Sequence, residues 1–425
     1  MKYVIIGNGI ASIGAIEGIR KVDTENTIMV IGAEDTPAYG RPLISYLLAG
    51  KITPDKLSLR PMQFYKQNNI ELKLGTTVTA VDVEQKTITT ADGETIEYEH
   101  LLIGTGGTPF TPPIPGSDGE GVYNFTNIEH AQQLITCAKD MKRAVVIGGG
   151  LIGLKAGEAL FDRGVDVSIV ELSDRVLSMA FDSHAAELAA ERLHEVGLNV
   201  LTGVSVKEIQ RDGDGKMVGV HLTDGSFLQT EVVVIAIGVI PNFDLARDGG
   251  INVDKGIVVN DHMATSVPNV YAAGDVAQAL DLLAGENRVL PIWPNAYNQG
   301  YCAGKNMAGE SVEYSGGLSM NSISFYGLPT ISVGTVNPAP DEQGVEISTI
   351  LDKKKKSYRK LVFKDNTLIG YVLVGDIDKA GLFTAFVKFK LPIDDTTKGR
   401  LMSGDPDMLL WPDAFFEETW NPEAD

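Results

Sequence analysis

The sequence predicts an α/β protein in which one parallel-sheet domain is inserted into another and a smaller α+β domain follows. Two observations support this fold class. An apolar strand, a glycine-rich turn and a helix with small residues on one face occur twice, at residues 3–18 and 144–161. A second strand follows each copy, at residues 27–31 and 165–170, in the order expected for parallel strands joined by a helix. Both domains are therefore expected to be Rossmann-like and to bind a dinucleotide.

The borders of these domains are predicted from turns rich in proline and glycine. The proline-rich segment 111–116 marks a crossing out of the first domain, and residues 238–241 mark the return. The first domain is then predicted to comprise residues 1–112 and 242–318, and the inserted second domain residues 113–241. Period-two segments with Asp-Gly turns in both domains indicate small antiparallel insertions.

After about residue 316 the pattern changes to strands of alternating polarity and ends in an apolar helix near residues 380–389. This pattern predicts a C-terminal α+β interface domain, residues 319–425. Residues 394–425, where aromatic residues stand among acids and prolines, are expected to form an extended tail packed along the body. The segment 351–400 holds twelve basic and six acidic residues, a local charge of +6 (12 minus 6) against −20 for the whole chain.

Length and composition exclude several classes of protein. With 425 residues, 44% of them hydrophobic and 22% charged, the chain has room for several folded domains and is too apolar to be disordered. Its net charge of −20 would repel the phosphates of nucleic acids and the anionic surface of membranes, so neither is expected as a partner. The longest apolar runs are shorter than the ~20 residues of a membrane-spanning helix. A strand begins almost directly after Met1, which leaves no room for a signal peptide and predicts a cytoplasmic location.

A glycine-rich loop at residues 148–153 completes the G-x-G-x-x-G pattern between a strand and a helix. The first glycine allows a tight turn, the second lets the backbone approach a pyrophosphate, and the third lets helix and strand pack closely. The phosphates then lie at the positive N-terminus of the helix. The predicted contacts in this loop are Gly148, Gly150, Leu151, Ile152 and Gly153.

Glu171 ends the next strand, 23 residues after Gly148 (171 minus 148). A carboxylate at this place accepts hydrogen bonds from the hydroxyls of an adenosine ribose and repels a 2′-phosphate, which favours NADH over NADPH. Arg175 lies one turn further on. The sequence leaves open whether Arg175 pairs with Asp174 or contacts a phosphate.

The first glycine-rich loop, residues 7–12, has a serine where the pattern has its third glycine. Serine is small enough for the packing role, and the predicted cofactor contacts of this loop are Gly7, Gly9 and Ser12. The acidic partner of the ribose is shifted outward, so Glu34 or Asp35 must serve. The sequence leaves this choice open, and Glu34 is the one included in the predicted site.

Three further segments resemble the fingerprints of one family. Residues 103–106 and 237–241 are similar to its two return motifs, and Thr265 with residues 270–275 is similar to its flavin signature. The family is that of the FAD-dependent pyridine nucleotide-disulfide oxidoreductases, which includes glutathione reductase and ferredoxin reductases. The resemblance extends over residues 3–300, and it implies that FAD binds in the first domain and NAD in the second.

The resemblance also assigns individual contacts. In this family the aspartate of the flavin signature, Asp275 here, binds the ribityl chain of FAD. Val78, Thr105 and Gly106 are likewise implied at the FAD, and Gly238 at the NAD. An aspartate alone would also suit a helix N-cap, but the full segment favours the flavin role.

Within the family, residues 39–45 and 293–300 look most like NADH:rubredoxin reductases, the flavin part of nitrite reductase large subunits and oxygenase-linked ferredoxin reductases. The resemblance places Arg41 and Pro42 over the FAD.

The same resemblance points the N-terminus of a helix that begins with Trp293 and Pro294 at the flavin pyrimidine. Pro294 suits a first helical turn, and the positive helix end would stabilise charge on the reduced flavin. Trp293 could instead be an ordinary core aromatic residue.

The redox cysteine of several relatives has no counterpart. Residues 44–50 align with the segment that carries it in NADH peroxidases, water-forming NADH oxidases and coenzyme A disulfide reductases, and they place Ala49 at the cysteine position. Cys137 and Cys302 cannot form an iron–sulfur ligand set and are expected to pack rather than react, in a reducing compartment. No metal site is predicted. Tyr46 and Lys155 also depart from residues common in the family.

Without a cysteine relay, electrons must leave the flavin directly. We therefore expect an FAD-dependent oxidoreductase that transfers a hydride from NADH to FAD and then single electrons, in either direction, to rubredoxin, a ferredoxin or an iron–sulfur subunit. Such carriers are commonly acidic, so the +6 segment would be their docking face. The alternative is that its lysines simply lie in water at an exposed hairpin turn.

Two other functions remain open. One is a cysteine-independent NADH oxidase that uses oxygen, and the other is an NADH-responsive redox-sensing or assembly flavoprotein. The sequence also leaves open whether the chain forms a homodimer or a subunit of a larger redox complex.

Overall fold

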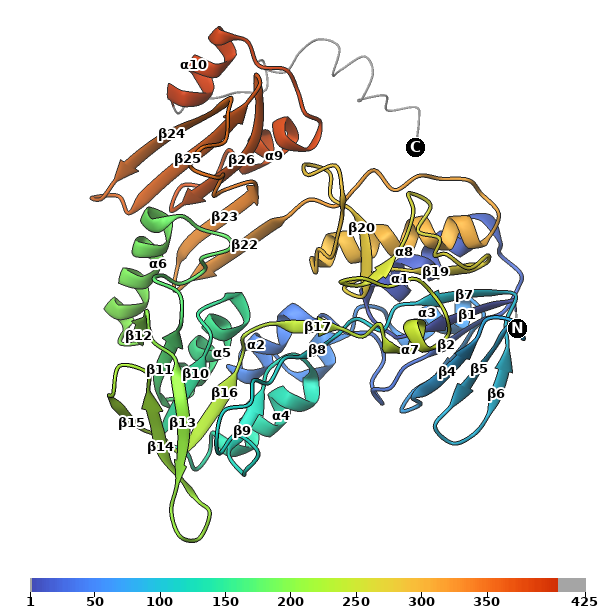
Figure 1. Cartoon of the computed structure of the whole chain (residues 1–425), viewed down its shortest axis with the longest axis horizontal. Coiled ribbons are helices and arrows are strands. Elements are labelled where there is room, and N and C mark those ends of the chain that lie inside the picture. The colour runs from blue at the N-terminus through green and yellow to red at the C-terminus, as the bar shows by residue number, and fades with distance from the viewer. Residues whose placement is uncertain (1, 404–425) are drawn as a thin grey trace. The chain divides into compact units, whose positions relative to one another are not determined.

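The computed structural model describes residues 2–403 and divides the chain into two compact units (Figure 1). Unit 1 comprises residues 1–147, 152–167 and 206–317, and unit 2 comprises residues 148–151, 168–205 and 318 onward. The α/β class with Rossmann-like cores is confirmed. The borders predicted for three domains stay a prediction.

A parallel five-stranded sheet forms the core of unit 1. β1 (Tyr3–Ile6) lies between β2 (Ile28–Ile31) and β7 (His100–Ile103), and β3 (Ile70–Lys73) and β19 (Val270–Ala272) form the two edges. Every residue of β1 and β2 is buried, which explains their continuous runs of apolar residues. β19 joins β7 from the far side of a long insertion, so the first Rossmann-like domain is interrupted as the sequence predicts.

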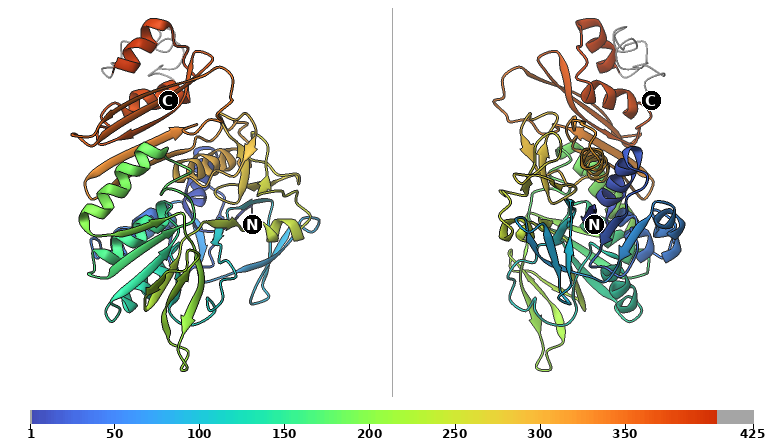
Figure 2. Two further views of the ribbon diagram at one scale, coloured as in Figure 1. Left: turned by 60° about the vertical axis from the view of Figure 1, so that its left-hand side comes forward. Right: turned by 90° about the vertical axis from the view of Figure 1, so that its right-hand side faces the viewer.

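Two glycine-containing helices of unit 1, α1 (Ile10–Val22) and α8 (Trp293–Met307), pack against each other at backbone distance (Figure 2). A Cβ added to Gly14 would lie 2.3 Å from a carbonyl oxygen of α8, and one added to Gly300 would lie 1.9 Å from a carbonyl oxygen of α1. Because no side chain fits at these positions, the spacing of the two helices depends on glycine.

Unit 1 has further short elements besides this sheet and these two helices. They are η1 (Arg41–Leu43), α2 (Ile44–Leu48), η2 (Pro54–Leu57), α3 (Met62–Gln67), the antiparallel strands β4 (Val78–Asp82), β5 (Thr87–Thr90) and β6 (Thr95–Glu97), then α7 (Asp244–Asp248), β18 (Ile257–Val258), β20 (Ala277–Leu280) and β21 (Asn287–Arg288).

The two connections predicted from proline and glycine run side by side. β8 (Gly107–Pro109) ends just before the outgoing segment, and it pairs antiparallel with β17 (Val239–Pro241), which lies within the returning segment. The chain therefore leaves the first sheet and returns to it through one two-stranded ribbon.

Unit 1 also contains part of the inserted domain. β10 (Arg143–Ile147) and β9 (Val122–Asn124) pair parallel with opposite edges of β16 (Val232–Ile235). The remaining elements are α4 (Ile128–Cys137), α5 (Leu151–Phe161) and an antiparallel meander of β13 (Val206–Arg211), β14 (Met217–Leu222) and β15 (Phe227–Gln229).

Unit 2 combines the rest of that domain with the C-terminal domain. β11 (Asp166–Glu171) pairs parallel with β12 (Asn199–Thr202), and α6 (Ser183–Val196) begins where the Asp182 carboxylate accepts the N–H of Ala185. A five-stranded antiparallel sheet follows, in the order β22 (Met320–Phe325), β23 (Leu328–Gly334), β26 (Thr367–Val374), β25 (Ser357–Lys364) and β24 (Val345–Asp352). The helix α9 (Ala380–Lys388) packs on this sheet.

The expectation of an extended tail from residue 394 is wrong in its first part. Residues Asp395–Ser403 form the helix α10, which Asp394 begins by accepting the N–H of Thr397 at 2.6 Å. An aspartate before a run of polar residues is a strong N-cap, and this local signal outweighed the aromatic and proline pattern further on. The other residues of the expected tail, 404–425, lie outside the described residues. In the part of the chain that the structure describes, every helix is too short or too polar to cross a membrane.

Candidate functional site

The first sheet gathers the residues predicted to bind FAD. The loop of Gly7 follows β1, Glu34 follows β2, Thr105 and Gly106 follow β7, and Asp275 follows β19. These four strands are neighbours and parallel, so the residues that follow them lie at the same edge of one sheet. In open parallel sheets, ligands bind outside this carboxyl edge.

The Gly7 loop has the tight form that a dinucleotide loop needs. Gly7 has φ +106°, and a Cβ on it would lie 2.1 Å from the carbonyl oxygen of Gly104, so only glycine fits. Ser12, in place of the third glycine, is buried and donates its hydroxyl to the Gly7 carbonyl at 2.9 Å. The serine therefore packs as predicted and also ties the helix to the loop.

Two polar side chains at this edge have no hydrogen-bond partner among the described residues. The amide nitrogen and oxygen of Asn8 are buried and have no hydrogen bond to any described residue. The Asp275 carboxylate is partly buried and accepts no hydrogen bond from the described residues, and burial raises its pKa, with the charge of Arg41 opposing that rise. Unpaired buried polar groups are costly, so both residues fit a site whose ligand donates and accepts hydrogen bonds. FAD, with ribityl hydroxyls and a pyrophosphate, is such a ligand.

Arg41, which the resemblance places over the FAD, is held from two sides. It forms an ion pair with Glu34 and donates from Nη1 to the carbonyl of Thr126 at 3.0 Å. Its guanidinium also lies 5.5 Å from the centre of the Tyr39 ring. Pro42 follows in η1 and is exposed.

The structure adds Tyr39 to this group. Its buried hydroxyl donates to Glu34 at 2.6 Å and accepts the N–H of Ile128, at the start of α4, at 3.0 Å. Burial raises the pKa of Tyr39 well above its usual range. Glu34 is therefore fixed by two donors, whereas Asp35 bonds only the neighbouring Thr36 hydroxyl among the described residues. Tyr39 stood in a segment quoted for its resemblance, but nothing in its spacing indicated this contact.

The return segments are tied to each other. The Thr105 hydroxyl donates to the carbonyl of Asn242 at 2.9 Å, and the Asn242 amide donates to the carbonyl of Thr105 at 2.9 Å. Gly106 and Gly238 have positive φ, +66° and +116°, and a Cβ on either would meet nothing within 4 Å. Val78, the remaining predicted FAD contact, lies at the start of β4 and packs against the core of unit 1.

The α8 helix begins as predicted. Trp293 is its first residue and Pro294 stands in its first turn, while the preceding Ile292 offers no side-chain cap. Trp293 is partly buried. Further along, Gln299 accepts the buried N–H of Gly274 at 2.8 Å, a contact that the sequence did not indicate.

Residues 148–151 of the second glycine loop lie in unit 2 with Glu171. Gly148 has φ +112°, and its N–H donates to the carbonyl of Val170 at 2.8 Å. The two oxygens of Glu171 accept the N–H groups of Gly149 at 2.5 Å and Ser173 at 2.7 Å. The carboxylate therefore lies against the loop, where a ribose partner is expected. Gly150 is exposed, with nothing within 4 Å of an added Cβ.

Other predicted residues near this loop have plain local roles. Leu151 begins α5, Ile152 is 40% exposed, and Gly153 is buried in the first turn. Of the two alternatives for Arg175, the pairing with Asp174 is found, at 2.8 Å.

Lys155, one of the departures from the family, has an acidic neighbour on its own helix. Its ammonium pairs with Glu158, one turn further along α5. Glu158 is only 7% exposed, and burial raises its pKa while Lys155 opposes the rise. The other departure, Tyr46, is 46% exposed.

Both cysteines pack. Cys302 is buried in α8, and burial raises the pKa of its thiol to about 11, which disfavours the thiolate at neutral pH. Cys137 is half-buried at the end of α4, with its sulfur 2.8 Å from the hydroxyl of Tyr123.

The basic segment 351–400 is less positive than its sequence suggests. Four of its lysines form ion pairs within unit 2: Lys356 with Glu195, Lys360 with Asp182, Lys364 with Glu342 and Lys398 with Glu346. Among its other basic residues, Lys353, Lys354 and Lys355 form one tip, which we call the lysine turn. It is exposed between β24 and β25 and has no ion pair with the described residues.

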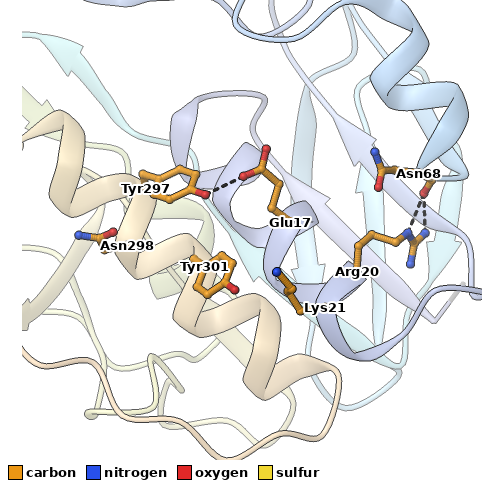
Figure 3. A pocket seen from close by; sticks show the side chains of 7 residues that line it. All are labelled: Glu17, Arg20, Lys21, Asn68, Tyr297, Asn298 and Tyr301. Atoms are coloured by element: carbon orange, nitrogen blue, oxygen red, sulfur yellow. Dashed lines mark hydrogen bonds between the residues drawn. The ribbon is translucent and has the colours of Figure 1, made fainter. Parts of the chain in front are cut away.

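A surface hollow of about 550 Å³ lies on the outer side of α1 and α8 (Figure 3). It is lined by Glu17, Arg20, Lys21, Asn68, Tyr297, Asn298 and Tyr301. Two of its charged groups are engaged locally, since Glu17 accepts the Tyr297 hydroxyl at 2.6 Å and Arg20 donates to the Asn68 carbonyl. None of the residues predicted to bind FAD or NAD lines it.

Comparisons with known proteins cover nearly the whole chain. Residues 1–300 match the family model described as pyridine nucleotide-disulphide oxidoreductase, and residues 320–390 match the rubredoxin NAD+ reductase C-terminal domain. The chain is 33% identical to nitrite reductase (NAD(P)H) of Bacillus subtilis over 93% of its own length and 48% of that protein's, so it spans about half of that relative. It is 32% identical to the epsilon subunit of NADH-dependent phenylglyoxylate dehydrogenase of Aromatoleum evansii over 91% of each. A ferredoxin reductase from Rhodopseudomonas palustris has a TM-score of 0.85 at 26% identity, covering 93% of this chain and 97% of that one.

Proposed function

The chain belongs to the pyridine nucleotide-disulphide oxidoreductase family, and from this premise we propose that it is an FAD-dependent enzyme that oxidises NADH and passes single electrons to an iron–sulfur protein. FAD, when bound, supplies the capacity to accept a hydride and to release electrons one at a time. The observation that carries the proposal is the carboxyl edge of the first sheet, where Gly7, Thr105, Gly106 and Asp275 converge beside unpaired Asn8.

The chain's own residues would bind and orient the two dinucleotides. The Gly7 loop and Asp275 would hold FAD by backbone N–H groups and a carboxylate, and Glu34 would hold the Arg41 guanidinium, with its hydrogen-bond donors, at the edge of the site. The N-terminus of α8 at Trp293 would favour negative charge near it. The loop that starts at Gly148 would bind NAD in the same way.

The absence of a sulfur relay determines the class of acceptor that we propose. Ala49 replaces the redox cysteine, and Cys302 is buried with a raised pKa. Electrons would then pass directly from the flavin, and a protein that takes one electron at a time is the natural acceptor. The match of residues 320–390 to the C-terminal domain of rubredoxin NAD+ reductase supports a carrier of this chemical class.

We propose NADH rather than NADPH as the donor because Glu171 lies against the second glycine loop. Its carboxylate would accept ribose hydroxyls and repel a 2′-phosphate. We further propose that the lysine turn contacts an acidic partner, since it presents three adjacent exposed lysines. The match over 91% of a dehydrogenase subunit favours a second arrangement, in which the chain works as one subunit of a larger redox complex.

Anaerobic mixing of the purified flavoprotein with NADH tests the proposal. We expect the flavin absorbance to bleach with NADH, and the colour to return when oxidised rubredoxin or ferredoxin is added. A variant with Cys137→Ser and Cys302→Ala should do the same, because neither thiol takes part. Loss of bleaching in this variant would contradict the direct route. Rapid return of colour with oxygen alone, and none with the carriers, would favour an NADH oxidase instead.

A further inference from the structure

Gln299 is a buried polar residue that no part of the proposed reaction has used. It lies on α8, is 2% exposed, and its Oε1 accepts the N–H of Gly274 at 2.8 Å. Gly274 directly precedes Asp275, and the backbone there makes a tight turn in which the N–H of Ala277 donates to the Gly274 carbonyl at 2.9 Å. The glutamine therefore holds the turn that carries the carboxylate.

The turn cannot easily be held in another way. Gly274 has φ +84°, and a Cβ on it would lie 3.2 Å from that of Ala11 at the start of α1. Its N–H is buried, so without the glutamine oxygen this donor would have no partner. The position of Asp275 thus depends on an acceptor that comes from a different element.

The place of Gln299 along α8 is itself fixed by backbone contact. Gly300 is the next residue, and a Cβ on it would lie 1.9 Å from the Ala11 carbonyl oxygen. Ala11 belongs to the first glycine loop and its helix. One short stretch of α8 therefore contacts both the Gly7 loop, through Gly300, and the Asp275 turn, through Gln299.

We infer that Gln299 is a positioning residue for FAD, which acts by setting the Asp275 carboxylate at the distance from the Gly7 loop that the cofactor requires. The inference rests on the proposed function, because it presumes that Asp275 binds FAD. It extends the site from the sheet edge to the interior face of α8.

A double-mutant cycle on FAD binding to the apoprotein tests the inference. Gln299→Leu keeps the volume and removes the acceptor, and we expect the Kd for FAD to rise about tenfold. Asp275→Ala should weaken binding by at least as much. If Gln299 acts through Asp275, adding Gln299→Leu to Asp275→Ala should change the Kd by less than about twofold.

A matched variant on the same helix controls for general loss of stability. Asn306→Leu removes another amide from α8, one that bonds the carbonyl of Val312 at 2.8 Å and not the Asp275 turn. It should lower the melting temperature of the apoprotein as Gln299→Leu does, yet leave the Kd for FAD within twofold. Gln299→Glu, which keeps the acceptor, should bind FAD more tightly at pH 5.5 than Gln299→Leu does.

The outcomes separate the inference from its premise. If the two effects are independent, the double variant will have a Kd for FAD about tenfold higher than that of Asp275→Ala. That result would overturn the positioning role. Equal loss of FAD affinity in Asn306→Leu would also overturn it. An unchanged Kd in Asp275→Ala would instead overturn the role of Asp275 in the proposed function.

Discussion

At the scale of single residues, the site depends on carboxylates in three different settings. Asp275 is partly buried and unpaired, Glu34 is fixed by Arg41 and Tyr39, and Glu171 accepts two backbone N–H groups. The Asp275 carboxylate has no donor among the described residues, and it lowers the stability of the apoprotein because burial disfavours its charged form. The other two are held in place by protein donors. A carboxylate in this site can therefore be left unpaired, so that it can accept hydrogen bonds from a ligand, or it can be held in one position by donors of the protein.

The cost of Asp275 can be measured. The pKa of a buried aspartate is raised, so the folded state binds a proton more readily than the unfolded state, and stability falls as pH rises above the unfolded value of 3.8. Asp275→Asn should therefore raise the melting temperature of the apoprotein at pH 7, and this gain should shrink below about pH 4. The same variant should weaken FAD binding, about tenfold if two hydroxyl contacts are lost. Melting curves of the apoprotein across pH, together with FAD titration, check both expectations. A lower melting temperature at pH 7 would contradict the first.

Glu171 provides the test of donor preference. Glu171→Arg should raise the ratio of activity with NADPH to activity with NADH by about tenfold or more, because a 2′-phosphate would meet a positive rather than a negative charge. Glu171→Gln is the control, since it keeps an oxygen near the Gly149 N–H without the charge. The measurement is kcat/KM with each nucleotide. An unchanged ratio in the arginine variant would remove the role assigned to Glu171.

At the scale of elements, the α1–α8 pair supports the edge of unit 1 where we propose that FAD binds. Each helix contributes glycines that let the other approach at backbone distance, and each carries part of the site: the Gly7 loop leads into α1, while α8 carries Gln299. The packing has no room for a methyl group. Errors in this contact would therefore displace the loop and the Asp275 turn together.

Gly300→Ala tests this packing. The added Cβ would lie 1.9 Å from a backbone oxygen, and backbone cannot move away as a side chain can. We expect a loss of about 1–3 kcal/mol in the free energy of unfolding, and weaker FAD binding with it. Gly381→Ala in α9 is the matched control, because its Cβ would meet nothing within 4 Å and alanine favours a helix over glycine. Chemical denaturation should show the opposite sign for the two variants.

At the scale of the whole molecule, part of the positive charge of segment 351–400 is paired with acidic residues. Four of the twelve basic residues in the segment of formal charge +6 form ion pairs, with Glu195, Asp182, Glu342 and Glu346, and the lysine turn is exposed on a chain of net charge −20. The backbone of that turn is ordered by Asp352, whose carboxylate accepts the N–H groups of Lys354 and Lys355. An acidic partner would find three adjacent exposed lysines at this turn.

Charge reversal of the lysine turn checks this picture. Replacing Lys353, Lys354 and Lys355 by Glu should raise the KM for an acidic rubredoxin or ferredoxin about tenfold at low salt, and less at high salt, because salt screens the attraction. Reduction of the bound flavin by NADH should stay unchanged. The control variant changes Lys139, Lys207 and Lys216, three exposed lysines of unit 1, and alters the net charge equally. Equal effects of the two triple variants would show that net charge, and not this turn, governs the encounter.

The sequence by itself determined the features that depend on residues close together in the chain. The glycine loops at Gly7 and Gly148, the strands that precede them and the acid at Glu171 follow from local patterns, because backbone sterics act within a few residues. The start of α8 at Trp293 was implied by the family resemblance, and Pro294 suits its first turn. The interruption of the first sheet was also predictable, since proline and glycine mark both connections. The predicted tail was wrong where a local aspartate cap made a helix instead.

Only the tertiary structure decided which side chains meet across long stretches of chain. The contact of Gln299 with Gly274 spans 25 residues, that of Tyr39 with Ile128 spans 89, and that of Lys356 with Glu195 spans 161. No periodicity links such pairs, because their approach depends on how separately formed elements pack. Packing determines which groups lie close enough to pair with a buried N–H or carboxylate. A buried group that is left unpaired lowers the stability of the fold, so a packing that supplies a partner is favoured. The sequence therefore determined the parts of the cofactor edge, and packing decided which groups hold those parts in place.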